Sequence, residues 1–201
     1  MKVIGLTGGI GSGKSFVAGV AEKFFPVLHI NTDEIARLQM LKGGASYEAV
    51  VNEFSKYTGE LLLNDGEINR PVLSKIVLND PALLKRLDEL THPPVIEETK
   101  RIIEVEKDKK EKVAVLIETA LLFEAGMDNI CDEVWYVYAP INTRKRRLKI
   151  SRGYSDERID GFLSRQVCEE EFLKRATRTV PNGDDVMEDD MVKIISAYLY
   201  D

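Results

Sequence analysis

Short apolar runs alternate with longer amphipathic segments along the chain, a pattern that predicts an α/β fold. The runs Val113–Ile117 and Glu133–Tyr138 are almost wholly apolar, as is typical of strands buried on both faces of a sheet. Further strands are expected at Lys2–Thr7, Pro26–Ile30 and Thr179–Val180. Because helical segments separate these strands, the sheet should be parallel, with right-handed crossovers.

Capping residues and prolines indicate where several helices begin. Asn69 and Asp80 each stand just before a proline-containing first turn, which is a common start of a helix. Asn31 or Thr32 can cap a further helix over residues 33–41.

Prolines also predict where a helix ends. The residue before a proline disfavours the α conformation, so Thr91-His92-Pro93-Pro94 should interrupt the helix that begins at Pro81. A separate, charged helix is then expected over residues 95–112. A closing helix is expected over residues 184–200.

The segment after the first expected strand carries the clearest chemistry. Gly8-Gly9-Ile10-Gly11-Ser12-Gly13-Lys14-Ser15 fits the pattern G-x-x-x-x-G-K-[ST], and an amphipathic helix is expected to follow it at Phe16–Phe25. Glycines let such a loop turn its backbone N–H groups toward a phosphate, and the helix N-terminus adds partial positive charge. Lys14 is expected to contact the β- and γ-phosphates, and the Ser15 hydroxyl to hold Mg²⁺. The residues expected to bind the nucleotide are Gly9, Ile10, Gly11, Ser12, Gly13, Lys14 and Ser15.

Composition narrows the class of protein further. The 201 residues are 44% hydrophobic and 31% charged, with a net charge of −6, so we expect a folded domain that is not a general nucleic-acid binder. Cys131 and Cys168 form no CxxC pair and His29 and His92 are the only histidines, which disfavours a disulfide scaffold or a zinc site. The apolar runs are too short to cross a membrane, and no signal-peptide segment is evident. A cytoplasmic protein, monomeric or weakly homo-oligomeric, is therefore expected.

The chain divides by pattern into a core and two additions. Residues 35–94 hold no strong strand and predict a helical, substrate-facing insertion. Residues 141–174 contain the run Arg144–Arg152, in which six of nine residues are basic. Such a run in an acidic chain predicts either a lid that closes on polyphosphate or an ordinary basic helix. The remaining segments, 1–34, 95–140 and 175–201, form the expected nucleotide-binding core.

Small-molecule kinases fit this length best among P-loop proteins. A switch GTPase needs Asn-Lys-x-Asp and Asp-x-x-Gly motifs, and neither occurs here. A hydroxyl acceptor gains from a carboxylate that takes its proton, whereas a nucleoside monophosphate mainly needs arginine clamps. Asp33 follows the second expected strand, at the sheet edge where α/β proteins bind ligands, and is the candidate general base. The alternative for Asp33 is a carboxylate that only stabilises a helix N-terminus.

Several segments together resemble the dephospho-CoA kinase family, in order and over nearly the whole chain. They are Gly5–Ser15, Thr32–Arg37, Asn69-Arg70, Leu90–Pro93, Leu121–Glu124 and Asn182. The resemblance implies a three-layer P-loop fold with a central parallel sheet of about five strands, a helical CoA-binding domain and a lid. It also implies transfer of a phosphoryl group from ATP to the 3′-hydroxyl of dephospho-CoA, with Mg²⁺.

The resemblance also assigns site residues by position. Asp33 matches the catalytic base, with Lys14 as the other catalytic residue, and Thr7, Arg70 and His92 are implied on the acceptor side. Arg147, Gln166 and Asn182 are implied near the lid and the adenine. Asn31 and Glu118 stand where the family usually has aspartates, and the lid arginines are shifted in spacing. A nucleoside or nucleoside monophosphate kinase, or a non-catalytic nucleotide-binding module, remains the alternative.

Overall fold

The computed structural model describes residues 1–164 and 168–201. Contacts within the chain group it into two units, residues 1–30 with 103–201 and residues 31–102. Each unit is described by itself. The segment 141–174 belongs to the first unit, and its role as a lid stays a prediction, as do the domain boundaries expected from the sequence.

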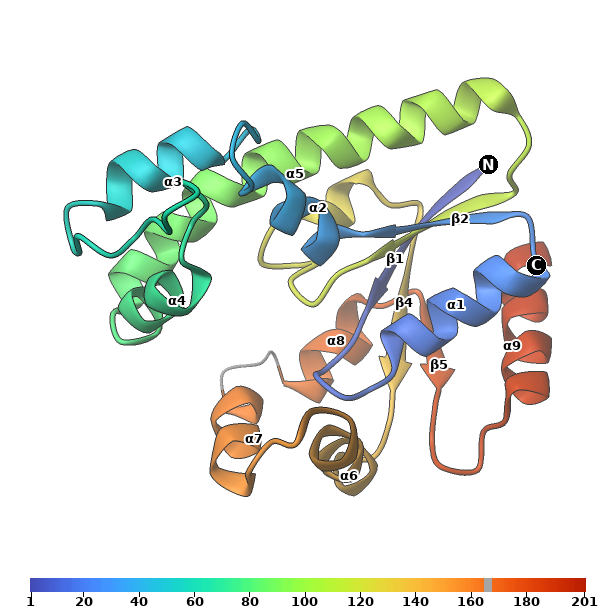
Figure 1. Cartoon of the computed structure of the whole chain (residues 1–201). Coiled ribbons are helices and arrows are strands. Elements are labelled where there is room, and N and C mark those ends of the chain that lie inside the picture. The colour runs from blue at the N-terminus through green and yellow to red at the C-terminus, as the bar shows by residue number, and fades with distance from the viewer. Residues whose placement is uncertain (165–167) are drawn as a thin grey trace. The chain divides into compact units, whose positions relative to one another are not determined.

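The first unit is built on a five-stranded sheet with the order β2-β3-β1-β4-β5 (Figure 1). The strands are β1 (Lys2–Thr7), β2 (Val27–Asn31), β3 (Ala114–Glu118), β4 (Glu133–Tyr138) and β5 (Arg178–Pro181). β1 pairs in parallel with β3 and β4, and β4 with β5. The α/β fold class with a central parallel sheet is therefore confirmed, as are the positions of the expected strands within a few residues.

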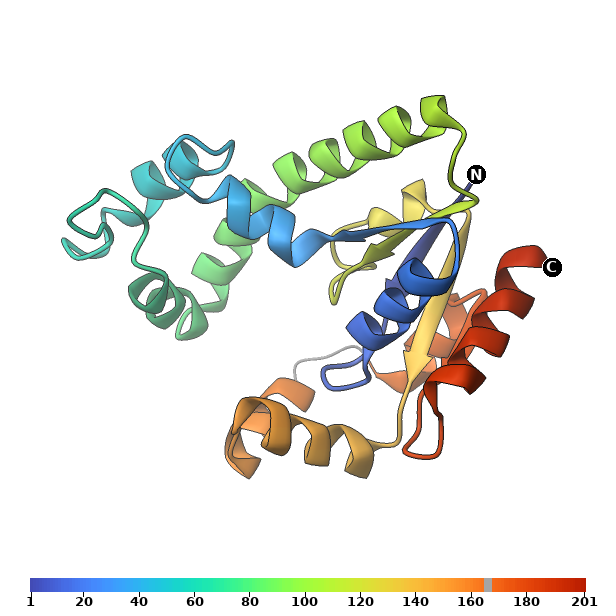
Figure 2. The ribbon, with the colours of Figure 1, turned by 45° about the vertical axis from the view of Figure 1, so that its right-hand side comes forward.

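Two helices cover one face of this sheet. α1 (Lys14–Phe24) and α9 (Glu188–Tyr200) lie side by side there, as Figures 1 and 2 show. Alternate residues of the strands point to this face because side chains of a strand alternate. The fully buried members of this core include Leu6, Val17, Leu116, Trp135 and Ile195.

The opposite face carries shorter elements. α8 (Glu169–Arg175) packs on β4 through Phe172, whose ring stacks on Tyr136 with a centroid distance of 4.9 Å. The 3₁₀ turn η1 (Met127–Ile130) contacts β1.

The basic run of the sequence forms α6 (Ile141–Arg152). This helix ends at Gly153, which has the left-handed conformation (φ 62°), and the chain then continues into α7 (Asp156–Leu163).

The second unit is helical and has its own apolar cluster. Its helices are α2 (Thr32–Gln39), α3 (Tyr47–Phe54), α4 (Arg70–Leu78) and the first part of α5 (Pro81–Lys109). The buried cluster consists of Tyr47, Val50, Phe54, Leu61, Ile68, Leu73 and Val77. The expected starts of α4 after Asn69 and of α5 after Asp80 are confirmed.

The expected break at Thr91-His92-Pro93-Pro94 is wrong, because α5 continues through both prolines. Proline lacks an N–H, so two helical hydrogen bonds are lost there. Leu83, Leu87 and Leu90 pack on the apolar cluster before the prolines, and Val95 is buried just after them. Packing on both sides therefore outweighs the local preference of the residue before proline. The largest further differences in helix limits are that α9 begins at Glu188 rather than at residue 184, and α5 ends at Lys109 rather than at residue 112. The limits of α1 and α2 differ from the expected ones by one or two residues.

Candidate active site

The loop Gly8–Ser15 connects the end of β1 to the first turn of α1. Gly11 and Gly13 have φ of 77° and 92°, a conformation that side chains with a Cβ rarely adopt. A Cβ on Gly13 would collide with the Asn182 amide, and one on Gly8 would lie 2.5 Å from the carbonyl oxygen of Val137. Glycine is therefore required both for the turn and for the close approach of neighbouring chain.

Two buried hydroxyls at this loop have no hydrogen-bond partner within the described residues, Thr7 Oγ1 and Ser12 Oγ. Unsatisfied buried donors are rare and point to a ligand or ordered water. They lie beside the N-terminus of α1, which carries partial positive charge. The loop thus provides hydrogen-bond donors and a positive electrostatic potential, both of which favour binding of an anionic group.

Lys14 and Ser15 begin α1 directly after the glycines. Lys14 Nζ donates to the carbonyl oxygen of Gly8 at 2.8 Å, so its ammonium group lies over the loop. Ser15 Oγ donates to Glu118 Oε1 at 2.6 Å. The register of the sheet explains this contact, because Leu6 on β1 pairs with Glu118 at the end of β3.

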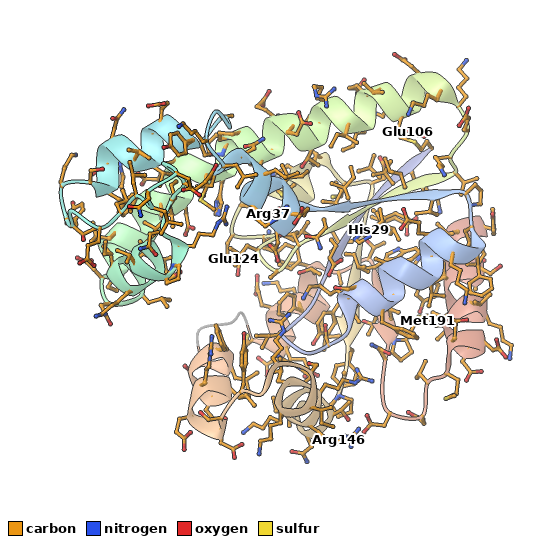
Figure 3. All side chains as sticks on the ribbon, in the orientation of Figure 1. His29, Arg37, Glu106, Glu124, Arg146 and Met191 are labelled. Carbon is orange, nitrogen blue, oxygen red and sulfur yellow. The ribbon has the colours of Figure 1, made fainter. Side chains whose placement is uncertain are left out.

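Glu118 also contacts His29, with 2.9 Å between His29 Nε2 and Glu118 Oε2. His29 extends from β2, the strand next to β3 in the sheet (Figure 3). Burial opposes the ionisation of Glu118, but the hydrogen bonds from His29 and Ser15 and the nearby charges of His29 and Lys14 outweigh it. The pKa of the Glu118 carboxyl consequently lies below its usual value.

Two arginines of α6 contact the loop and the segment after β5. Arg144 Nε donates to Ile10 O at 2.9 Å, and burial lowers the pKa of Arg144 against the opposing effects of Tyr136 and Glu169. The two terminal nitrogens of Arg147 donate to Asn182 O and Gly183 O, each at 3.0 Å. α6 is thereby attached to the phosphate-binding loop by side chains that carry positive charge.

Three other basic residues of α6 pair with acidic residues away from the loop, and Arg152 lies over the ring of Tyr154. Lys145 lies 2.6 Å from Asp160, and Lys149 lies 2.7 Å from Asp156 on α7. Arg146 pairs with Asp184 and is visible on α6 in Figure 3. The basic run is thus a helix with two sets of partners, one at the loop and one on acidic side chains.

A cavity of about 330 Å³ lies beside the loop and is large enough for a nucleobase. Its lining residues are Gly13, Phe16, Arg147, Asn182 and Val186. Asn182 is buried, and its amide donates to Ser12 O at 2.7 Å. The structure therefore brings the residues expected to bind nucleotide, including Arg147 and Asn182, into one place in the first unit.

The second unit holds Asp33, Arg70 and His92, whereas Thr7, also expected on the acceptor side, ends β1 in the first unit. Asn31 is the side chain that caps α2: its Oδ1 accepts from the backbone N–H groups of Asp33 and Glu34 at 3.0 and 3.2 Å. Asp33 therefore stands exposed in the first helical turn, two residues after β2. Arg70, at the start of α4, donates to the carbonyl oxygen of Arg37 on α2 at 2.7 Å.

His92 lies on the proline-containing part of α5. Its Nε2 is 3.5 Å from Asp88 Oδ1 one turn earlier. Burial raises the pKa of Asp88, and the positive charge of His92 opposes that rise. Thr91, beside it, donates to Leu87 O at 2.9 Å. Gln166, the remaining residue implied by the resemblance, lies outside the described residues.

Sequence reasoning did not identify the pairing of Glu118 with His29. The signal for Glu118 is its place as the polar residue that ends an apolar strand beside the phosphate-binding loop. No comparable signal marks His29, because its role depends on β2 lying next to β3.

Two features are absent from the described part of the chain. None of its helices is long and apolar enough to span a membrane. In the same residues, no three His, Cys, Asp or Glu side chains gather in a way that could hold a metal ion. A metal site rich in protein ligands is thus not among the described features.

Comparisons with known proteins give a consistent result. The family model described as dephospho-CoA kinase matches residues 2–188. The dephospho-CoA kinase of Moorella thermoacetica is 38% identical over 186 residues, which cover 92% of this chain and 86% of that protein. Among solved structures, TT1252 from Thermus thermophilus superposes with a TM-score of 0.76 at 32% identity, covering 98% of this chain and 96% of the other. Dephospho-CoA kinase from Campylobacter jejuni superposes with a TM-score of 0.71 at 25% identity, with the same coverage.

Proposed function

We propose that this chain, which belongs to the dephospho-CoA kinase family, transfers the γ-phosphoryl group of ATP to the 3′-hydroxyl of dephospho-CoA. The products are coenzyme A and ADP. The observation that carries the proposal is a formed phosphate-binding loop, with Lys14 and Ser15 in place, in a chain that matches the family over residues 2–188. The chain is an ATP-dependent kinase by family.

The phosphates of ATP are bound, on this proposal, by the backbone N–H groups of Gly9–Ser15. Lys14 turns from Gly8 O toward the β- and γ-phosphates, where its charge offsets the negative charge that develops in transfer. The base occupies the cavity between Phe16, Arg147 and Asn182. Because Asn182 O and Gly183 O accept from Arg147, the guanidinium is held rigidly at the wall of that cavity.

The residues beside Lys14 fit Mg²⁺. Mg²⁺ prefers oxygen ligands and is usually held by one or two protein oxygens together with substrate phosphates. The Ser15 hydroxyl donates to the ionised Glu118 carboxylate and keeps its lone pairs for a cation. When bound, Mg²⁺ neutralises charge on the β- and γ-phosphate oxygens. Ser15 would hold it directly, and Glu118 would orient Ser15.

Asp33 is the proposed general base. An ordinary aspartate is ionised at neutral pH and can take the proton of the acceptor hydroxyl as the new O–P bond forms. Asn31 supports this role by satisfying the N–H groups of the first turn of α2. The Asp33 carboxylate is then not required as the cap of its own helix.

The acceptor is proposed to contact Thr7, Arg70 and His92. Thr7 Oγ1 is a buried hydroxyl without a hydrogen-bond partner in the described chain, so it is available to donate to an anionic or hydroxyl group. Arg70 supplies a guanidinium and His92 an imidazole in the helical unit, and such hydrogen-bond donors suit the phosphates of dephospho-CoA. The contact of Arg70 with Arg37 O fixes the direction of its guanidinium.

An acceptor panel tests the proposal. The protein is incubated with ATP and Mg²⁺ and with dephospho-CoA, AMP, CMP or UMP in separate reactions, and ADP release is followed. Rapid turnover with dephospho-CoA alone is expected. Turnover with a nucleoside monophosphate and none with dephospho-CoA would replace the proposal, and nucleotide binding without turnover on any acceptor would indicate a binding module.

A further inference from the structure

The buried carboxylate of Glu118 is held from two sides. Its side chain is only 8% exposed. Oε1 accepts from Ser15 on α1, and Oε2 lies 2.9 Å from His29 Nε2 on β2. Two neighbouring elements near the N-terminus, α1 and β2, thus meet at one carboxylate that ends the sequence-distant strand β3.

The direction of these hydrogen bonds follows from the groups that form them. Ser15 Oγ donates to Oε1, and a carboxylate offers only acceptor sites. His29 Nε2 must therefore carry the proton and donate. Ser15 likewise donates its single hydroxyl proton, which leaves its lone pairs directed elsewhere.

Glutamate needs such restraint more than a shorter acid would. It has one more rotatable bond than aspartate, and its free side chain populates many rotamers. A hydrogen bond to Oε2 fixes the plane of the carboxylate, and with it the position of Oε1 relative to Ser15. Partners outside the first layer of metal ligands commonly orient those ligands in this way.

We propose that His29 is a positioning residue for nucleotide-bound Mg²⁺: it fixes Glu118 so that Glu118 holds the Ser15 hydroxyl with its lone pairs toward the cation. The inference rests on the proposed ATP and Mg²⁺ binding at Ser15. It assigns a role to β2 in metal affinity. It does not require His29 to touch the nucleotide, the cation or the acceptor.

Equilibrium binding of ADP tests this without catalysis. The dissociation constant of ADP is measured with Mg²⁺ and again in EDTA. The ratio of the two values is the gain in ADP affinity that Mg²⁺ provides. The variants are His29→Ala, which removes the donor, and His29→Gln, whose amide nitrogen can donate from a similar position. Leu28→Ala, on the same strand with its side chain toward the opposite face, is the control for loss of packing.

The expected result is a loss of roughly 10-fold in the Mg²⁺-dependent gain for His29→Ala, the size seen when outer-layer partners of metal ligands are removed. ADP affinity in EDTA should stay at the wild-type value, His29→Gln should recover most of the gain, and Leu28→Ala should keep it. An unchanged gain in His29→Ala would overturn the inference. If His29→Ala and Leu28→Ala both lost ADP affinity to the same extent with Mg²⁺ and in EDTA, His29 would have a purely structural role. That result would also overturn the inference.

Two further measurements distinguish a failure of this inference from a failure of the proposed function on which it rests. If wild-type protein binds ADP with no dependence on Mg²⁺, the assignment of Mg²⁺ to Ser15 fails and the role of His29 fails with it. If the wild type depends on Mg²⁺, the outcome concerns His29 alone. In a Glu118→Gln background, His29→Ala should cause no additional loss, because its effect passes through the carboxylate; a further full loss would contradict that route.

Discussion

The side-chain amide of Asn182 donates a hydrogen bond of 2.7 Å to the carbonyl oxygen of Ser12. This contact joins the segment after the last strand to the phosphate-binding loop. The backbone carbonyl oxygen of Asn182 in turn accepts a hydrogen bond from Arg147 on α6. The conformation of the loop is thus tied to both the nucleobase cavity and the basic helix.

Replacement of Asn182 should therefore affect nucleotide binding and stability together. Asn182→Ala leaves Ser12 O without this donor, and a lost buried hydrogen bond costs about 1–3 kcal/mol of the free energy of unfolding. Asn182→Asp should be worse, because an ionised carboxylate would face the Ser12 carbonyl oxygen. KM for ATP should rise in the same order. Wild-type KM values in both variants, measured by initial rates, would contradict a role at the loop.

Lys14→Ala should lower turnover strongly with little change in stability. In the proposed mechanism the ammonium group stabilises charge on the transferring phosphoryl group, and removing such a group costs on the order of 10²-fold or more in turnover. Its bond to Gly8 O is half-exposed, so the midpoint of thermal unfolding should stay close to wild type. Turnover within a few-fold of wild type would remove Lys14 from the catalytic residues.

Two double variants of α6 test whether its basic run acts as a lid or is an ordinary basic helix. Arg144 donates to Ile10 O and Arg147 to Ser12 O in the loop, whereas Lys145 and Lys149 pair with acidic residues of α7. Replacing each pair by glutamine removes the same charge from the same helix. The arginine pair should raise KM for ATP by roughly 10-fold or more, through loss of charged hydrogen bonds. The lysine pair should have a much smaller effect.

Salt dependence provides the check on that comparison. If α6 acted only by its summed charge, both double variants would weaken ATP use equally and both would flatten the dependence of KM on ionic strength. Equal effects would therefore argue against specific arginine contacts. A large fall in the unfolding midpoint of the arginine variant with unaltered kinetics would show that these contacts are structural.

Asp33→Asn should reduce turnover by roughly 10²–10⁴-fold, the contribution usual for general acid–base catalysis. The amide keeps the shape of the side chain but cannot accept a proton. KM for ATP and dephospho-CoA should move much less, because the lost interaction belongs mainly to the transition state. Since Asn31 rather than Asp33 caps α2, the helix cap is kept in this variant. Recovery of turnover by excess Mg²⁺ would instead assign Asp33 to the metal.

Local patterns were sufficient for the sheet and the phosphate-binding loop. The five strands follow from apolar runs, and the loop follows from glycine spacing between a strand and a helix. Residues 91–94 show the limit of such patterns. Two consecutive prolines predict a helix end, but Leu87, Leu90 and Val95 keep α5 packed on both sides.

The candidate site was predictable only where one short segment carries it. Lys14 and Ser15 belong to a single motif, and their neighbours are set by the backbone. His29 and Glu118 are 89 residues apart, and their pairing arises from the order of β2 and β3 in the sheet. The division of the α6 charges between loop carbonyls and acidic side chains likewise depends on tertiary contacts that no local pattern contains.

The position of the transferred phosphoryl group is the most direct test of whether this protein phosphorylates the 3′-hydroxyl of dephospho-CoA. The protein is supplied with ATP, Mg²⁺ and dephospho-CoA, or with analogues that lack either the 2′- or the 3′-hydroxyl of the ribose, and the products are identified by mass and by phosphorus–proton coupling. One added phosphoryl group is expected on the 3′-oxygen, with full reaction of the 2′-deoxy analogue and no reaction of the 3′-deoxy analogue. Phosphorylation of the 3′-deoxy analogue, or of the 2′-oxygen in dephospho-CoA itself, would contradict it.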